Sequence, residues 1–247
     1  KSLTGKIHRR SNGVNKLYII GIGFRPFDKK ASEIIYNSSL ILTTSNRLYE
    51  LFKECEEFEE VKGRIKVITN VDETINFIKS KISNPPFPPL AKGGEGGFIV
   101  LLASGDPMFH GIGRRAVKEF GEDMVEILPD LSCIQIAFSR IKEPWDDAFL
   151  ISLHRSGNLE KNKYEIEDIP LLLTRHNKIV ILTNEQNNPA QIAQKVKGLP
   201  VIMYVCERIG YDDEKITKGA PEVILKMEFL TPNVVILQNR VGEKTNG

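Results

Sequence analysis

Residues 101–115 read LLASGDPMFHGIGRR, and this stretch decides the expected fold. Its apolar run ends at Ser104, residues 105–107 turn the chain, and two glycines then precede residues with helical spacing. An unbroken apolar run before such a turn is typical of a central parallel strand that is covered on both faces. A strand, a tight acidic turn and a helix in this order predict an α/β fold. The turn is either simple architecture or one wall of a ligand site.

Strand-like apolar runs alternate with helical periodicity on both sides of this stretch, which predicts two α/β domains. Asp28, Ser45 and Asn188 each precede a helical pattern and are expected N-caps. The expected division is a leader over residues 1–15, an N-terminal domain over 16–128, a C-terminal domain over 129–240 and a tail over 241–247. Within the first domain, residues 83–97 (SNPPFPPLAKGGEGG) are expected to form an inserted surface loop, because proline and glycine disfavour regular structure.

Composition excludes several classes of function. The 247 residues are 41% hydrophobic and 27% charged, with a formal net charge of +2, which gives no electrostatic case for nucleic-acid binding. No apolar run reaches the roughly 18 residues that a membrane span needs. The cysteines and histidines lack metal-ligand spacing. We therefore expect a cytoplasmic protein that binds no metal, membrane or nucleic acid.

Several short motifs leave two interpretations open. Residues 21–26 (GIGFRP) follow a strand, but Pro26 stands where a dinucleotide-binding fingerprint needs its third glycine. Asp106 can offer its carboxylate to an ammonium or hydroxyl group, or it can only cap its own turn. His154 and Arg155 follow another strand, either as a polar wall for an anionic substrate or as part of a solvated loop.

The order of these blocks is more specific than any one of them. From the N-terminus it runs GIG, ASGDPMFHGIGR, VEILPDLSCIQIAFSRI, PWDDAFLISLHRSG, VCERIGYDDEKI and PNVVIL. In this order the chain resembles the tetrapyrrole methylase superfamily from Lys16 to Gln238. Within the superfamily it is similar to the subgroup that methylates carbon 5 of a cobalt-precorrin or precorrin in cobalamin (vitamin B12) biosynthesis. The resemblance implies two α/β domains with S-adenosylmethionine in a cleft between them, and a homodimer.

The resemblance also implies which residues bind the two ligands. The expected cofactor contacts are Gly23, Phe24, Ser104, Gly105, Asp106, Phe109, Ser132, Cys133, Thr183, Ile209 and Gly210. The expected contacts to the corrinoid substrate are Arg114, His154 and Arg155. No residue is assigned as an acid or base, because a sulfonium methyl is already a strong electrophile and the protein has mainly to position it.

Two Pro-Gly pairs that are usual in the superfamily are replaced in this sequence, and Asn184 stands where the subgroup often has Asp. Phe24-Arg25 stand where the superfamily usually has Pro-Gly after its first turn, and Pro129-Asp130 stand where the linker usually has Pro-Gly. Fused members of the subgroup carry a second methyltransferase that acts on carbon 15 with decarboxylation. Because this sequence ends at Gly247, a separate enzyme is expected to catalyse that step.

Other functions stay open at this stage. Within the superfamily they are methylation of another tetrapyrrole position, of diphthamide or of ribosomal RNA. Outside it they are a cofactor-binding module without turnover and a nicotinamide-dependent oxidoreductase.

Overall fold

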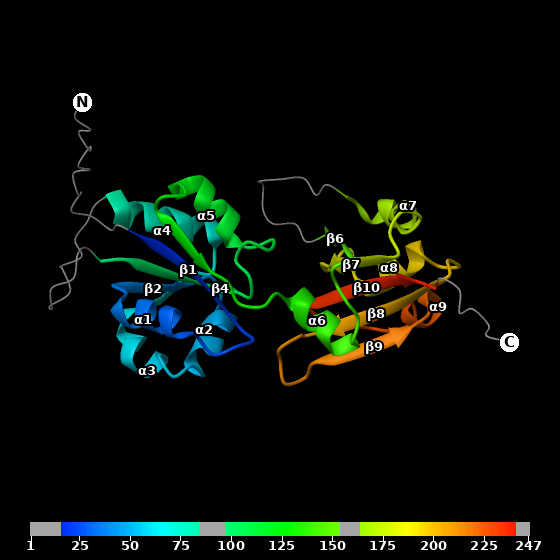
Figure 1. The fold of residues 1–247 in the computed structure, drawn as a ribbon, viewed down its shortest axis with the longest axis horizontal. Coiled ribbons are helices and arrows are strands. Elements are labelled where there is room, and N and C mark those ends of the chain that lie inside the picture. The colour runs from blue at the N-terminus through cyan, green and yellow to red at the C-terminus, as the bar shows by residue number, and fades with distance from the viewer. Residues whose placement is uncertain (1–15, 84–96, 154–163, 241–247) are drawn as a thin grey trace, which may run out of the picture. The chain divides into compact units, whose positions relative to one another are not determined.

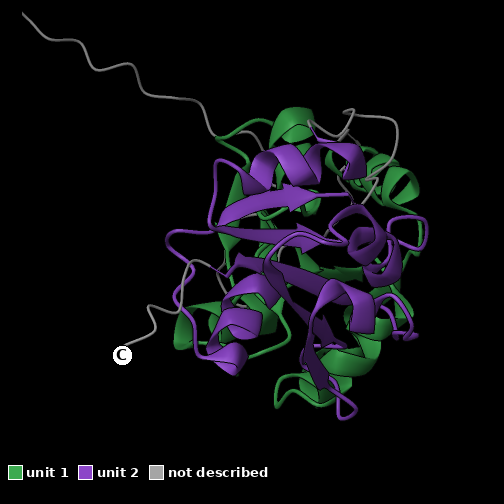
Figure 2. Cartoon of the chain, turned by 90° about the vertical axis from the view of Figure 1, so that its right-hand side faces the viewer, with its two compact units in different colours: residues 1–131 green, residues 132–247 purple. Residues whose placement is uncertain are grey.

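The computed structural model describes residues 16–83, 97–153 and 164–240 (Figure 1). The expected leader and tail and almost all of the proline- and glycine-rich loop lie outside the described residues. The chain divides into two compact units, one ending at Leu131 and the other beginning at Ser132 (Figure 2). Each unit contains one five-stranded sheet with helices, which confirms the predicted α/β class.

Unit 1 is built on a parallel sheet with the strand order β3-β2-β4-β1-β5. Its strands are β1 (Leu17–Ile22), β2 (Leu40–Thr43), β3 (Ile65–Val67), β4 (Ile99–Ser104) and β5 (Val125–Leu128). Its helices are α1 (Lys29–Asn37), α2 (Asn46–Lys53), α3 (Phe58–Val61), α4 (Val71–Ser83) and α5 (Ile112–Phe120), with a 3-10 turn at Lys62–Arg64.

The apolar run before Ser104 forms the central strand β4, as predicted. Its residues are buried from Ile99 to Ala103. Alternate side chains of β4 enter two different cores: Val100 packs with α1 and α2 on one face, and Leu101 packs with α4 and α5 on the other. A strand that is covered on both faces has no solvated side, so none of these positions can be polar.

Unit 2 is built on a mixed sheet with the strand order β6-β7-β10-β8-β9. Its strands are β6 (Phe149–Ser152), β7 (Lys178–Leu182), β8 (Val201–Glu207), β9 (Lys215–Gly219) and β10 (Asn233–Asn239). Its helices are α6 (Cys133–Ile141), α7 (Ile169–Leu173), α8 (Pro189–Lys195) and α9 (Pro221–Ile224), and a 3-10 turn at Ile166–Asp168 precedes α7.

The middle of the unit 2 sheet is antiparallel. β10 pairs antiparallel with both β7 and β8, β8 and β9 form a hairpin, and only β6 and β7 run parallel. Helices α7, α8 and α9 contribute Leu172, Ile192 and Ile224 to one hydrophobic core with the strands. Because β10 runs against its neighbours, its first residue lies beside the carboxyl ends of β7 and β8.

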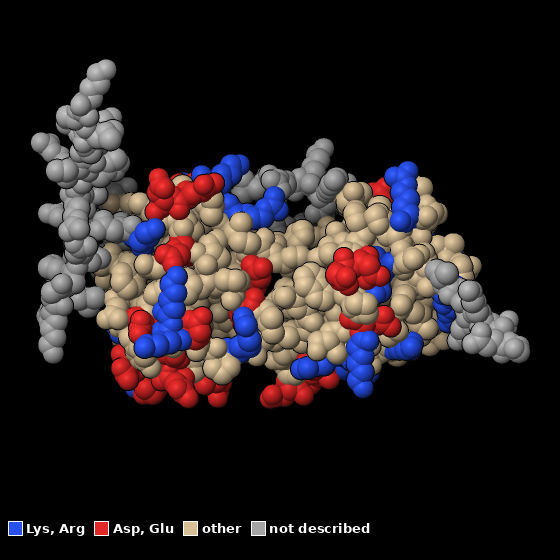
Figure 3. Space-filling model, viewed as in Figure 1, with Lys and Arg blue, Asp and Glu red and all other residues tan. Residues whose placement is uncertain are grey.

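The described part of the chain contains no helix that is both long and apolar enough to cross a membrane. On the face drawn in Figure 3, basic and acidic side chains are interspersed over much of the surface, and acidic side chains gather over α3 in unit 1. Glu54, Glu56, Glu59 and Glu60 are exposed in that region.

Candidate functional site

The loops after β1 and β4 leave neighbouring strands toward opposite faces of the unit 1 sheet. β1 leads into α1 and β4 leads into α5, and these two helices belong to the cores on opposite faces (Figure 1). Where the strand order reverses in this way, a crevice opens beyond the carboxyl ends of the strands, and ligands bind there in open α/β sheets. The structure brings together at this edge the predicted contacts Gly23, Phe24, Ser104, Gly105, Asp106 and Phe109.

The chain bends at Gly105, and the bend is packed against main chain. Gly105 has a φ of +59°, a conformation that favours glycine. Its N–H donates to the Ile22 carbonyl over 3.0 Å, and its carbonyl accepts from the Asp130 N–H over 3.2 Å. A Cβ on Gly21 would lie 2.0 Å from the Gly105 carbonyl oxygen. The ends of β1, β4 and β5 are therefore held together by main-chain contacts that require glycine.

The Asp130 carboxylate links the same loops from below the surface. Its side chain is 5% exposed. Oδ2 accepts the Phe24 N–H over 2.7 Å, and Oδ1 accepts the Arg25 Nε–H over 2.8 Å. The residues that replace the two usual Pro-Gly pairs are thus hydrogen-bonded to each other. Asp130 fixes both the first loop, through its side chain, and the Gly105 bend, through its backbone.

One carboxylate oxygen of Asp106 accepts a hydrogen bond within its own turn, and the other oxygen does not take part in that turn. Oδ1 accepts the Met108 N–H over 2.8 Å, which is the architectural role that its position allows. The second oxygen accepts no hydrogen bond from the residues that the structure describes, and the side chain is half-buried. Asp106 can therefore shape the turn and still accept a hydrogen bond from a ligand.

The neighbours of Asp106 leave room and polar groups at this edge. Ser104 is exposed at the end of β4. A Cβ added to Gly23, whose φ is +148°, would meet no described atom within 4 Å beyond those of its two chain neighbours. Phe109 is half-buried, and its ring lies edge-on to His110 with centroids 5.0 Å apart.

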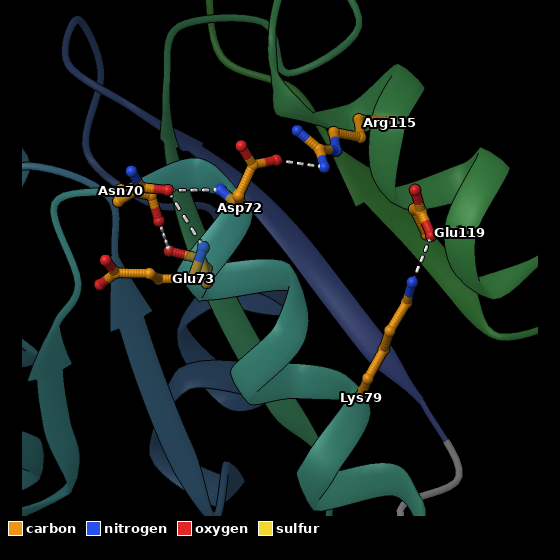
Figure 4. A network of polar contacts seen from close by, with 7 residues as sticks. Asn70, Asp72, Glu73, Lys79, Arg115 and Glu119 are labelled. Atoms are coloured by element: carbon orange, nitrogen blue, oxygen red, sulfur yellow. Dashed lines mark hydrogen bonds and ion pairs between the residues drawn. The ribbon is translucent and has the colours of Figure 1, made fainter. Parts of the chain in front are cut away.

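The two arginines at the start of α5 have different surroundings. Arg114 is exposed, as a residue that reaches a substrate has to be. Arg115 instead pairs with Asp72, at the N-terminus of α4 (Figure 4). The side chain of Asn70 accepts the Asp72 N–H over 2.8 Å, so Arg115 joins α5 to a capped helix. The other predicted substrate contacts, His154 and Arg155, lie outside the described residues.

In unit 2, Ser132 caps α6 and Cys133 is the first residue of that helix. The Ser132 hydroxyl accepts the Gln135 N–H over 3.3 Å, and the Gln135 side chain accepts the Ser132 N–H over 2.8 Å, which completes a capping box. Ser132 is 8% exposed. Its small side chain is thus explained by the helix, and a cofactor contact there stays a prediction.

Thr183, Ile209 and Gly210 follow the carboxyl ends of β7 and β8, so the structure places them at one edge of the unit 2 sheet. The Thr183 hydroxyl lies 2.6 Å from Asn233 Oδ1 and 2.8 Å from the Asn233 carbonyl oxygen, and it donates to that residue. The Gly210 N–H donates to Glu214 over 2.9 Å. Ile209 is 6% exposed between residues 208 and 210, which both have positive φ.

Glu207 carries a buried carboxylate beside this turn. The residue is 3% exposed, and its Oε1 accepts the Leu230 N–H over 2.8 Å. Its Oε2 is buried and has no hydrogen-bond partner among the described residues. The carboxylate anchors the loop before β10 to the end of β8.

The sequence matches the model of a known protein family over most of its length. The model of the Tetrapyrrole (Corrin/Porphyrin) Methylases matches residues 16–222, which includes both loops at the unit 1 edge and the turn after β8. The chain belongs to this family. Its structure has the tetrapyrrole methylase fold, with an α/β sheet in each unit. Family membership makes it a methyltransferase.

Individual tetrapyrrole methylases are similar over nearly the whole chain. A probable cobalt-precorrin-7 C(5)-methyltransferase of Methanocaldococcus jannaschii is 28% identical over 220 residues, which cover 86% of this chain and 93% of the relative. The crystal structure of a precorrin-6Y methylase from Archaeoglobus fulgidus has a TM-score of 0.64 at 17% identity, covering 93% of this chain and 100% of that one. A uroporphyrin-III C-methyl transferase from Thermus thermophilus, solved with S-adenosylhomocysteine, has a TM-score of 0.62 at 16% identity, covering 90% and 97%.

Sequence reasoning missed two residues that shape the edge in this tetrapyrrole methylase. Arg25 and Asp130 were noted only as departures from the superfamily pattern, yet they form an ion pair. The two residues are 105 positions apart in the sequence, so no local motif indicates that they pair. The available signal was that both glycines of the usual pattern are replaced by residues of opposite charge.

No three His, Cys, Asp or Glu side chains within residues 16–83, 97–153 and 164–240 are grouped as a metal site would require.

Proposed function

We propose that this tetrapyrrole methylase transfers a methyl group from S-adenosylmethionine to carbon 5 of a cobalt-precorrin during cobalamin biosynthesis. The observation that carries the proposal is the similarity to the Methanocaldococcus jannaschii relative, whose name states methyl transfer to carbon 5 of a cobalt-precorrin. The alignment covers 93% of the relative, so the likeness is not limited to one unit. The substrate class follows from that name, and the chemistry follows from the family.

Support for S-adenosylmethionine as donor comes from the Thermus thermophilus enzyme, which shares the fold and was solved with S-adenosylhomocysteine. The groups at the unit 1 edge fit the amino-acid part of such a ligand. An ammonium group needs acceptors, and the second oxygen of Asp106 and the Ser104 hydroxyl are available to it. Apart from its two neighbours in the chain, no described residue lies within 4 Å of a Cβ built on Gly23.

S-adenosylmethionine supplies an electrophilic methyl group when it is bound. The contribution of the chain is to bind, orient and exclude water, which can lower a barrier substantially because the reacting groups no longer have to find each other. Asp130 and the glycines at positions 21 and 105 hold the loops in one arrangement. In the proposal, Asp106 and Ser104 bind the amino-acid part within this fixed frame.

The contacts proposed for unit 2 come from the edge formed by β7 and β8. Main-chain groups of residues 183, 209 and 210 would bind the nucleoside part, and residues 132 and 133 would line the same ligand from the start of α6. The substrate carries several carboxylates, and Arg114 would bind one of them together with His154 and Arg155. A homodimer, a cytoplasmic location and a separate enzyme for carbon 15 belong to the same proposal.

The test is mass spectrometry of the corrinoid after incubation with methyl-labelled S-adenosylmethionine. One labelled methyl group at carbon 5 is the expected product. A labelled methyl group at another ring carbon would show that the proposed position is wrong. Binding of S-adenosylhomocysteine without methyl transfer to any corrinoid would contradict the proposed reaction.

A further inference from the structure

Arg25 presents an oriented guanidinium group at the edge where the donor is proposed to bind. Its side chain is 55% exposed, although its Nε–H donates to the buried Asp130 carboxylate over 2.8 Å. The two terminal nitrogens donate to no residue that the structure describes. A guanidinium group has five N–H donors in one plane, so four remain for a ligand.

Asp130 gives this guanidinium its orientation. A free arginine on a surface loop samples many rotamers and pays for losing them when it binds. Here the Nε–H is tied to a side chain that is itself 5% exposed and held by the Phe24 N–H. The hydrogen bond fixes the Nε end of the guanidinium at Asp130, while the Arg25 side chain stays more than half exposed. The Asp130 N–H also donates to the Gly105 carbonyl, so Arg25 is anchored to a residue that contacts the Gly105 bend.

We propose that Arg25 binds a carboxylate group at this site and that Asp130 is the residue that positions it. The inference rests on the proposed function, because both proposed ligands carry carboxylates. One source is the amino-acid carboxylate of the methyl donor, and the other is an acetate or propionate side chain of the macrocycle. A planar guanidinium suits carboxylates in either ligand.

The first experiment measures binding to wild type and to Arg25→Gln by calorimetry. S-adenosylhomocysteine carries the amino-acid carboxylate, whereas 5′-methylthioadenosine has the same nucleoside and lacks it. If Arg25 binds the donor, S-adenosylhomocysteine affinity falls about tenfold, as expected for one charge-assisted hydrogen bond, and methylthioadenosine affinity is unchanged. Lys29→Gln is the matched control, because Lys29 is a 91% exposed cation four residues away.

The second arm measures steady-state kinetics with a cobalt-precorrin. If Arg25 binds the macrocycle, both calorimetric affinities stay at the wild-type value, the KM for the cobalt-precorrin rises about tenfold, and kcat changes less than KM. Arg25→Lys keeps the charge without the planar fork and is expected to recover only part of the loss.

Asp130→Asn keeps an acceptor for the Phe24 N–H and leaves Arg25 in place, so it provides a second route if Arg25→Gln does not fold. It should weaken binding of the same ligand, by less than the loss of Arg25 itself. Folded Arg25 and Asp130 variants that match wild type in both arms would overturn the assignment while leaving the proposed function intact. A wild-type protein that neither binds S-adenosylhomocysteine nor methylates the cobalt-precorrin would overturn both proposals.

Discussion

Asp130 is buried, and a buried carboxylate is costly unless hydrogen bonds replace the lost water. Its two donors are the Phe24 N–H and the Arg25 Nε–H. A proline at position 24 would have no N–H, and a glycine at position 25 would have no guanidinium. The usual superfamily residues could not satisfy this carboxylate, so the substitutions at the two loops depend on one another.

Asp106 allows its two roles to be separated by two substitutions. Asp106→Asn keeps an oxygen for the Met108 N–H and removes the charge, whereas Asp106→Ala removes both. We expect both variants to bind S-adenosylhomocysteine about ten- to a hundredfold more weakly, because a charge-assisted hydrogen bond is lost. Only Asp106→Ala should also lower the melting temperature. Calorimetry and thermal denaturation check the two effects, and unchanged affinity in a folded Asp106→Ala protein would remove Asp106 from the site.

The cysteine thiols at positions 55 and 206 are expected to be unreactive in the folded protein. Burial raises the pKa of Cys55 to about 11 and that of Cys206 to about 12, and nearby carboxylates add to both shifts. At pH 8 the thiolate fraction of Cys206 should be about a thousandfold lower than that of a thiol with a pKa of 9.0. Iodoacetamide should therefore label both cysteines far more slowly in the native protein than in the unfolded protein. Peptide mass spectrometry measures the extent of labelling at each position.

The same shift predicts how stability depends on pH. Because the folded pKa of Cys206 is raised, the unfolded state loses its proton first, and the stabilisation present below pH 9 is lost as pH rises toward 12. Cys206→Ala should flatten this part of the curve. Labelling of native Cys206 at the rate of a free thiol would contradict the prediction.

At the scale of secondary-structure elements, the sequence predicts the features that depend on residues close together in the chain. Asp28, Ser45 and Asn188 cap α1, α2 and α8 as predicted, each accepting an N–H from three residues further along the chain. The central position of β4 followed from its apolar run. The short helices α3 and α7 were not predicted, because four or five residues give too little periodicity to recognise.

The sequence predicts where the candidate site lies, but it does not predict the contacts that hold the loops of that site together. The carboxyl ends of β1 and β4 were the expected location, since the strand–turn–helix order marks them. The contacts that fix the loops join residues more than one hundred positions apart, and sequence spacing carries no information on such contacts. The structure therefore supplies the contacts that hold these loops together, whereas the ligand-binding roles at the unit 1 edge and at the unit 2 edge stay predictions.

A substitution at Gly21 tests whether the ends of β1, β4 and β5 must be in contact. A Cβ there would lie 2.0 Å from the Gly105 carbonyl oxygen and 2.4 Å from the Asp130 nitrogen, so Gly21→Ala should force β1, β4 and β5 apart. We expect a loss of about 1–3 kcal/mol in the free energy of unfolding, with weaker binding of S-adenosylhomocysteine. Gly63→Ala is the control, because a Cβ at Gly63 would meet no described residue within 4 Å apart from its chain neighbours. Equal stability of the two variants, measured by urea denaturation, would argue against the close contact.

At the scale of the whole molecule, the proposed chemistry needs no cluster of acid, base or metal ligands. It needs surfaces that hold the two ligands in the correct relative position. Accordingly, the similarity to the family lies in the order of the sequence motifs along the chain. That order spans both units, since the family match covers residues 16–222. This explains why no single motif identified the chain while the sequence of motifs did.

Each unit has its own hydrophobic core, which predicts that each folds alone. Unit 1 buries residues between its sheet and its helices α1 to α5, and unit 2 buries a separate set around Val205 and Val235. A domain with its own core folds independently when no core contact is cut. Fragments 16–131 and 132–240 should therefore each unfold cooperatively, as followed by circular dichroism. Fragment 16–121 is the control: it lacks β5 and Asp130, leaves the Phe24 N–H and Arg25 without their partner, and should be much less stable. A fragment 16–131 as unstable as this control would show that unit 1 depends on the rest of the chain.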